Sequence, residues 1–134
     1  MKLSFSPSLP LLTFAIALGF SSVAVANSGE ATYKQVCASC HGSGVLKSPK
    51  LGNKAQWAPL IAEGQVTLTA HGYVGVRKMP AKGGKPDLSI EDFADSVVYL
   101  VNQSGGNWKS PDAKMLLAIN KEVEARKAGL NKSK

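Results

Sequence analysis

The five residues Cys37-Ala38-Ser39-Cys40-His41 constrain this chain of 134 residues more than any other stretch of its sequence. Two thiols three positions apart lie close together on a helical turn, and an imidazole follows them at once. A Cys-x-x-Cys-His run of this kind is the attachment signal of c-type haem, in which the thiols add to the two vinyl groups and the histidine binds the iron. The chain has no other cysteine, so a zinc site of four thiolates is excluded.

A dithiol redox site of the thioredoxin kind is the main alternative for this cysteine pair. Such a pair follows a β-strand within a βαβ unit, whereas residues 33–36 before Cys37 have helical character. A histidine directly after the second cysteine is also an addition to that motif. A catalytic disulfide, a structural disulfide and a metal clip stay open beside haem. We expect haem, with Cys37 and Cys40 as attachment points and His41 as an iron ligand.

The first 26 residues have the pattern of a secretory signal peptide. Lys2 gives a positive start, an apolar run extends from Leu9 to Phe20, and Ala24-Val25-Ala26 is a small-x-small end. We therefore expect cleavage after Ala26 and a periplasmic protein, which fits covalent haem attachment outside the cytoplasmic membrane. Retention of the segment as an anchor helix is the alternative, although the apolar run is short for a membrane span.

The chain is basic, with a formal net charge of +7 that becomes +6 when Lys2 is removed. A balance of this sign favours acidic partners or anionic surfaces. Nucleic acid is a poor candidate, because the lysines are spread from Lys34 to Lys134 without interleaved aromatic residues and the protein is expected to be exported. We expect acidic redox protein partners and no stable membrane span after signal cleavage.

Five helices are predicted from apolar spacing, caps and breakers. Their ranges are 29–38, 54–62, 66–76, 89–103 and 110–128, and the range 66–76 could instead be a pair of turns, because Gly72 and Gly75 loosen it. The helix over 89–103 is the clearest, because Ser89 is a good N-cap, its apolar residues recur at three and four, and Gly105-Gly106 gives a stop. We expect it to pack against the helix over 29–38.

The predicted helix over 110–128 has Ser110 as its cap, Pro111 at its first position and Gly129 at its end. Its apolar stripe consists of Met115, Leu116, Ile119 and Val123. A stripe of this width needs a surface to cover. We expect the stripe to pack on its own domain, and packing on a partner protein or on a second copy of the chain is the alternative.

The second axial ligand of an iron bound by His41 is expected to be Met79. Pro80 forces Met79 toward an extended conformation, so its thioether can leave the helical register and point inward. The default role of a methionine is to fill the core. His71 is the only other histidine and the only competitor, and we expect it to be a partly exposed turn residue. A backbone carbonyl near Pro49 is well placed to accept the second ring hydrogen of His41, although Pro49 has loop stiffening as an alternative role.

Two lysine-rich segments flank these residues. Lys47, Lys50 and Lys54 follow the cysteine motif, and Lys78, Lys82 and Lys85 surround Met79. Both segments are expected to border the haem edge, so the sequence predicts a positive surface there. Such a surface acts mainly on the rate of encounter with an acidic partner.

Together these residues resemble a class I cytochrome c and are similar to its small bacterial monohaem branch, often called c-five-like. The resemblance rests on Gly29-x-x-x-Tyr33-x-x-x-Cys37-x-x-Cys40-His41-Gly42, Trp57, Met79-Pro80-x-x-Gly83 and a terminal amphipathic helix with Tyr99. It implies an all-α fold around one covalently bound haem, with first and last core helices that cross near perpendicular. It further implies thioethers at Cys37 and Cys40, His41 and Met79 as axial ligands, and Trp57 near the propionates.

The expected organisation is a signal peptide over 1–26, a monohaem domain over 27–106 and a helical extension over 107–134. The role of the extension cannot be carried over from the family, because the family domain ends before it. The predicted function is electron transfer, since two filled axial positions leave no open site for catalysis at iron. The alternatives are a dedicated haem subunit of a larger redox complex and a haem enzyme or sensor with an open or weakly held sixth site.

Overall fold

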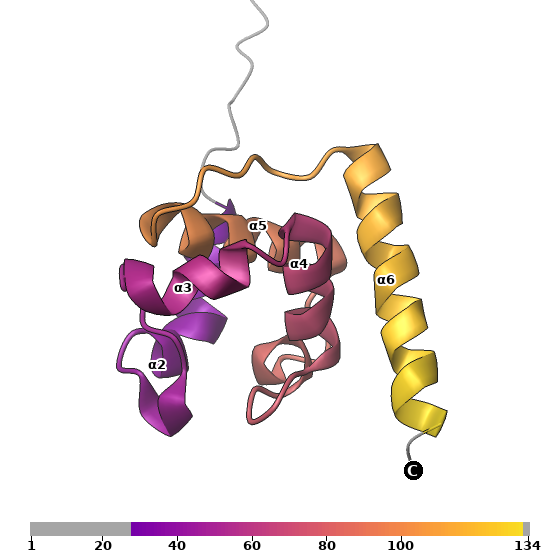
Figure 1. Ribbon diagram of the computed structural model, residues 1–134, viewed down its shortest axis with the longest axis horizontal. Coiled ribbons are helices and arrows are strands. Elements are labelled where there is room, and N and C mark those ends of the chain that lie inside the picture. Colours follow the sequence, from indigo (N-terminus) through magenta and orange to yellow (C-terminus); the bar gives the residue numbers. More distant parts are fainter. Residues whose placement is uncertain (1–27, 133–134) are drawn as a thin grey trace, which may run out of the picture.

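The computed structural model describes residues 28–132, so the predicted signal peptide over 1–26 lies outside the described residues. Its helical elements are α1 (Ser28–Thr32), η1 (Tyr33–Cys37), α2 (Ala38–His41), η2 (Val45–Lys47), α3 (Lys54–Ile61), α4 (Gln65–Val74), η3 (Ala81–Gly84), α5 (Ile90–Gln103) and α6 (Ala113–Lys132) (Figure 1). Within this range there is no β-strand, and one isolated antiparallel bridge joins Val76 to Met79. The all-α prediction is confirmed. None of the helices in the described part is long and apolar enough to cross a membrane.

The first three elements form one continuous helix over 28–41, which is longer than the predicted range 29–38. Its middle segment η1 is a π-helical turn, in which the Ala38 N–H donates to the Tyr33 carbonyl. Such turns are rare in proteins, and those that occur are often found at functional sites. This one ends at Cys37, so the irregular turn leads directly into the cysteine motif.

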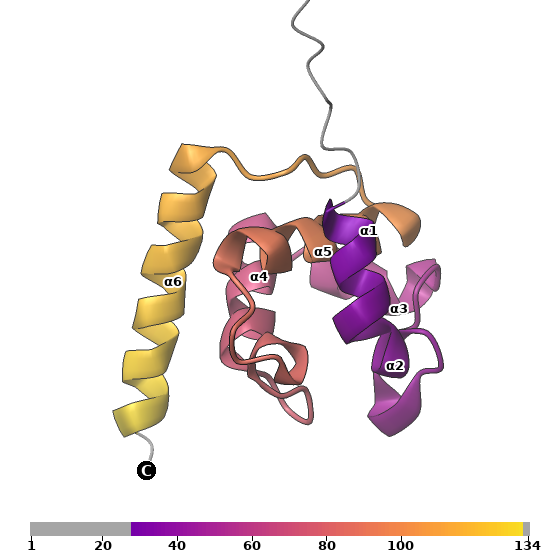
Figure 2. The ribbon, with the colours of Figure 1, turned by 180° about the vertical axis from the view of Figure 1, so that it is seen from behind.

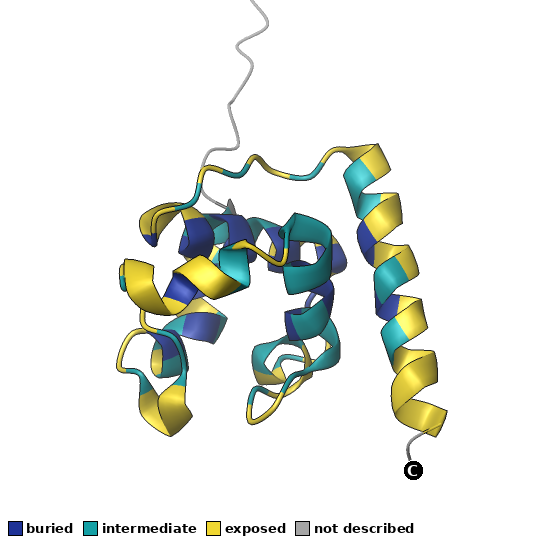
Figure 3. Cartoon of the chain, in the orientation of Figure 1, coloured by how far each residue is buried: buried dark blue, intermediate teal, exposed yellow. Residues whose placement is uncertain are grey.

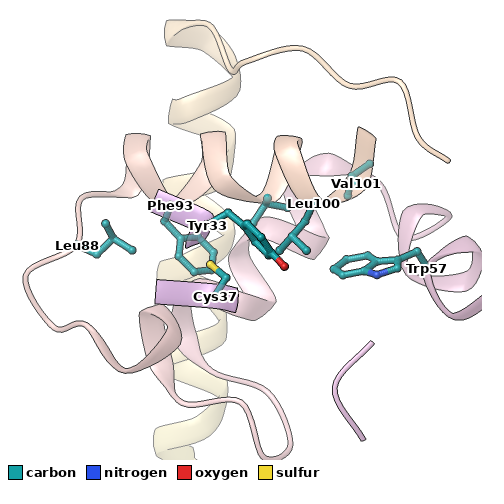
Figure 4. Close-up of a cluster of buried hydrophobic side chains, with 8 residues drawn as sticks. Tyr33, Cys37, Trp57, Leu88, Phe93, Leu100 and Val101 are labelled. Carbon is teal, nitrogen blue, oxygen red and sulfur yellow. The ribbon is translucent and has the colours of Figure 1, made fainter. Parts of the chain in front are cut away.

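The N-terminal helix crosses α5, as predicted, and the two meet closely at Gly29 (Figure 2). A Cβ added at Gly29 would collide with the backbone carbonyl of Asp95. Glycine at this position therefore allows the two backbones to approach. Around the crossing lies the main core, which consists of Tyr33, Cys37, Trp57, Leu88, Phe93, Val97, Leu100 and Val101 (Figure 4).

Helix α5 matches its prediction most closely. The Ser89 hydroxyl accepts a hydrogen bond of 3.1 Å from the Asp92 N–H, as an N-cap should. At the other end, the Gly106 N–H donates to the Val101 carbonyl at 2.8 Å and closes the helix. The short helices α3 and α4 lie within two residues of their predicted ranges.

Helix α6 differs from its prediction at both ends. It starts at Ala113, and its capping side chain is Asp112, whose Oδ1 accepts the Met115 N–H at 2.8 Å. The predicted cap Ser110 is wrong, because the carboxylate of Asp112, two residues nearer the apolar stripe, satisfies the free N–H and suits the helix dipole. The predicted stop at Gly129 is also wrong, since the helix continues to Lys132.

The apolar stripe of α6 packs on its own domain. Ile119 and Val123 are completely or almost completely buried, while most of the helix is exposed (Figure 3). Both belong to a second core cluster with Ala70 of α4 and with Ile90 and Ala94 of α5. The helix of the extension therefore packs mainly on α4.

Candidate functional site

A cavity of about 500 Å³ lies between the N-terminal part of the domain and helices α3, α4 and α5. Most of its wall is apolar and comes from Leu46, Trp57, Leu60, Leu68, Val76, Val97 and Leu100. His41, His71 and Met79 also line it. Its volume and apolar lining are those of a cofactor site.

His41 is buried, and both its ring and its backbone carbonyl make hydrogen bonds. Its Nδ1 lies 2.8 Å from the carbonyl oxygen of Pro49. A carbonyl can only accept, so Nδ1 carries the hydrogen and the Nε2 lone pair is left for a metal. The His41 carbonyl in turn accepts the Leu51 N–H at 2.7 Å. The predicted contact between the Pro49 carbonyl and His41 is confirmed.

The two cysteines lie on the helix that carries His41, and both are free thiols. Cys37 is buried with its Sγ 3.9 Å from the Ser96 hydroxyl, and Cys40 is partly exposed. Burial raises the pKa of the Cys37 thiol, and the hydrogen bond with Ser96 opposes that rise. A dithiol oxidoreductase needs a lowered thiol pKa, so this environment does not suit the thioredoxin alternative. Neither thiol is among the residues that line the cavity.

Met79 is held at the cavity by a tight turn of the backbone. Its N–H donates to the Val76 carbonyl at 2.9 Å, and the Val76 N–H donates to the Met79 carbonyl at 3.1 Å. Gly72 of α4 makes room for the ring of Phe93, because a Cβ there would lie 2.8 Å from Phe93 Cζ, and Met79 Cε lies beside the same position at 3.5 Å. The structure thus brings Met79 and His41 to one cavity.

His71 differs from its prediction. It lies inside α4 instead of in a turn, and its side chain lines the same cavity with 18% of its area exposed. Its Nδ1 is 2.8 Å from Glu63 Oε2. The sequence contains a signal that was missed: Leu68, His71 and Gly72 recur at three and four, which places them on one face of a helix.

Trp57 is buried beside His41, with ring centroids 5.8 Å apart. Its indole N–H donates to the Lys50 carbonyl at 2.8 Å. That hydrogen is therefore already used, and Trp57 contributes an apolar wall to the cavity rather than a donor for a propionate.

The donor set fits a covalently attached haem. It offers apolar walls, an oriented imidazole with a free Nε2, a thioether on the same cavity and two unpaired thiols one turn apart. Within residues 28–132 no group of three or more His, Cys, Asp or Glu side chains is arranged to hold a metal ion. The metal-clip alternative thus gains no further ligands from this part of the chain.

Comparison with known proteins agrees with this donor set. Residues 24–100 match the family model described as cytochrome c oxidase, cbb3-type, subunit III. Cytochrome c-555 of Chlorobaculum thiosulfatiphilum is 46% identical over 83 residues, which cover 59% of this chain and 96% of that protein. Cytochrome c5 of Azotobacter vinelandii is 34% identical over 74 residues, which cover 54% of this chain and 89% of that protein.

The fold is also similar to a solved cytochrome c. That chain comes from a crystal structure of an electron transfer complex of nitrite reductase with cytochrome c, and the TM-score is 0.57 at 35% sequence identity. The match covers 59% of this chain and 96% of the solved one. The family match ends before α6 begins. The chain therefore belongs to the cytochrome c family, among the small monohaem class I cytochromes that carry one covalently bound haem c.

Proposed function

We propose that this protein is a periplasmic electron carrier whose haem is attached through Cys37 and Cys40 and bound axially by His41 and Met79. The family establishes haem-based electron transfer and a carrier rather than an enzyme. The observation that carries the finer proposal is the single apolar cavity lined by both His41 and Met79, with His41 oriented by the Pro49 carbonyl. Among the described residues 28–132, no other methionine lines that cavity.

Each of these residues has a separate task in the proposed mechanism. A bound haem iron supplies the one-electron change of oxidation state. His41 offers Nε2 in a fixed direction because Nδ1–H is held by Pro49, and Met79 offers a soft thioether that favours the reduced iron. The apolar walls would exclude water, and an iron held by both His41 and Met79 would have no open position for a substrate. The protein would therefore pass electrons with little other chemistry.

The proposed location follows from the sequence alone. Cleavage after Ala26 would release a chain that starts at Asn27, with the monohaem domain over 27–106 and the extension over 107–134. Haem attachment to Cys37 and Cys40 outside the cytoplasmic membrane agrees with this route.

We test the proposal by an optical spectrum in both oxidation states and a potentiometric titration of the haem-loaded protein. The expected result is a low-spin spectrum with a methionine-sulfur charge-transfer band in the oxidised form, and a single reversible one-electron wave. A high-spin oxidised spectrum without that band would instead favour the enzyme or sensor with an open sixth site.

Acidic redox proteins are the proposed partners. The related cytochrome c was crystallised in an electron transfer complex with nitrite reductase, which supports a redox protein as the partner. Of the six lysines near the proposed haem edge, Lys47 and Lys78 line the cavity. Lys82 is bonded to the Pro86 carbonyl at 2.8 Å, and Lys85 forms an ion pair of 2.8 Å with Asp87. Lys47 and Lys78 are therefore the stronger candidates for steering.

We predict that hexacyanoferrate(III), an anionic acceptor, oxidises the reduced protein more slowly as salt rises. The reason is that charges farther apart than the Debye length, about 10 Å at 0.1 M salt, no longer attract each other effectively. The double variant Lys47→Glu/Lys78→Glu should lower the rate by about tenfold at low salt and move the potential little. Stopped-flow spectroscopy measures the rate, with the double variant Lys114→Glu/Lys121→Glu on α6, outside the cavity, as the charge-matched control. Rates that do not depend on salt would place the encounter elsewhere.

A fixed subunit of a larger redox complex is the second candidate, because the matching family model is described as an oxidase subunit. Purification from native membranes and periplasm separates the two. Recovery at constant stoichiometry with other polypeptides would favour the subunit, and recovery as a free monomer would favour the carrier.

A further inference from the structure

A second cavity of about 490 Å³ lies between the C-terminal end of α4, the turn after it and the C-terminal half of α6. Its apolar walls include Val74, Val76, Ala125 and Leu130, and Arg77 and Arg126 also line it. We call it the α4/α6 groove. The family match ends at residue 100, so one wall of this groove belongs to the extension.

The α4/α6 groove adjoins the proposed haem site. Val76 and Arg77 line both cavities, and Met79 closes the same turn through its two hydrogen bonds with Val76. A group seated in the groove would therefore contact the same turn that presents Met79. Helix α6 of the extension therefore lies close to the proposed haem site.

Arg77 is held in this shared wall by an unusual backbone conformation. Its φ is 53°, and it occupies the first central position of the two-residue turn from Val76 to Met79. Turns of this kind favour Gly, Asn or Asp at that position, because a larger side chain strains the left-handed backbone. Arg77 is exposed and makes no ion pair with the residues of the described range. Its guanidinium is thus available to an anion from outside.

Arg126 supplies the second cation on the opposite wall. Arg126 forms an ion pair with Glu122 of the same helix, with Nε 3.2 Å from Oε1. The buried Nε makes no hydrogen bond within the described part of the chain. The groove therefore contains two guanidinium groups and one carboxylate. A planar guanidinium binds carboxylates through paired hydrogen bonds. The apolar walls beside it suit a side chain without charge, and Leu130 is 51% exposed there.

We propose that the α4/α6 groove is a docking site for an acidic segment of the redox partner, and this proposal rests on the proposed electron-carrier function. One carboxylate of the segment binds Arg77 and Arg126. A neighbouring apolar side chain of the segment packs on Val74, Ala125 and Leu130. The extension then acts by placing the partner beside the Met79 turn.

The test uses the reduced haem-loaded protein and two synthetic peptides. One is an acetylated and amidated hexapeptide of alternating Leu and Glu, and the other replaces each Glu with Gln. Chemical shifts in two-dimensional NMR spectra are followed during titration. We expect the acidic peptide to shift the signals of Val74, Val76, Ala125 and Leu130 in a saturable way, and the Gln peptide to bind at least tenfold more weakly.

Two variants separate docking from folding. Arg77→Gly removes the guanidinium and also relieves the strained backbone, so it should weaken peptide binding by about tenfold without lowering the melting temperature. Arg126→Gln should weaken binding by a similar factor. Lys114→Gln removes the same charge from the first turn of α6, outside the groove, and should leave binding within twofold of the unchanged protein.

Three results would overturn the proposal. They are equal binding of the two peptides, shifts confined to the lysine segments around Lys47 and Lys78, and binding that Arg77→Gly and Arg126→Gln do not weaken. Binding of phosphatidylglycerol vesicles in place of the peptide would also overturn it, in favour of a membrane surface. The optical spectrum and potential of the same samples report on His41 and Met79, so a failure of the electron-carrier proposal is seen separately.

Discussion

Replacing Met79 with alanine should lower the reduction potential and open the iron to added ligands. In the proposed site the thioether is the soft ligand that favours reduced iron, and among residues 28–132 no other methionine lines the cavity. Axial ligands alter haem potentials over about 0.8 V in total, so a fall on the order of 0.1 V or more is expected. Potentiometric titration measures the fall, and the spectrum of the reduced variant under carbon monoxide shows whether the sixth position is open.

His71→Ala is the matched control, because His71 lines the same cavity as Met79. Its Nδ1 is paired with Glu63 Oε2 at 2.8 Å, and in the proposed site Met79 would occupy the iron position for which His71 competes. We expect its spectrum and potential to remain nearly unchanged. The reverse result, with a large effect of His71→Ala and a small effect of Met79→Ala, would assign the iron two histidine ligands. A double variant then shows whether His71 replaces Met79 when the thioether is lost.

The parts of this molecule that sequence could predict depend on contacts close along the chain. The Ser89 cap, the apolar face of α5 and the contact of His41 with Pro49 each involve residues at most eight positions apart. The packing of α1 on α5 is a longer contact. It was still predictable, because two apolar faces of similar length in a small domain must cover each other.

The errors have local physical causes. Periodicity assumes 3.6 residues per turn, so it could not show the π-helical turn over Tyr33–Cys37. Ser110 and Asp112 are both good caps by residue type, so residue type alone could not choose between them, and in the structure Asp112 Oδ1 accepts the Met115 N–H. Gly72 and Gly75 suggested a loose turn around His71, whereas Gly72 lies within α4, where the ring of Phe93 requires a residue without a Cβ.

The α4/α6 groove could not be predicted for a different reason. Its walls come from residues 74–77 and 122–130, which only the docking of α6 on α4 brings together. The sequence did indicate that the stripe of α6 needs a surface. It did not indicate that covering this stripe leaves Arg126 facing the same space as Arg77.

The variant Cys37→Ala/Cys40→Ala, produced in the periplasm, should lack covalent haem and fail to fold cooperatively. The cavity of about 500 Å³ would then have nothing to fill it. Its apolar walls would then face water, and leaving a Val or Leu side chain exposed costs about 1.5 to 3 kcal/mol each, so the loss over several such walls is comparable with the whole stability of a small domain. Helices α3 and α4, which form much of the cavity wall, are expected to lose their packing first.

Mass spectrometry of the purified chain detects covalent haem, and circular dichroism with a thermal scan reports helix content and cooperativity. Ser39→Ala is the control within the same turn. Ser39 is exposed, its hydroxyl lies 3.9 Å from Cys40 Sγ, and it forms no thioether, so this variant should keep both haem and stability. Loss of the thiols themselves does not explain a collapse, since Cys→Ala removes one atom at each site. Haem added to the purified double variant should restore part of the helix signal, because His41 and Met79 remain. If the double variant without haem stayed helical, monomeric and cooperative on heating, the haem would not be the core of this fold.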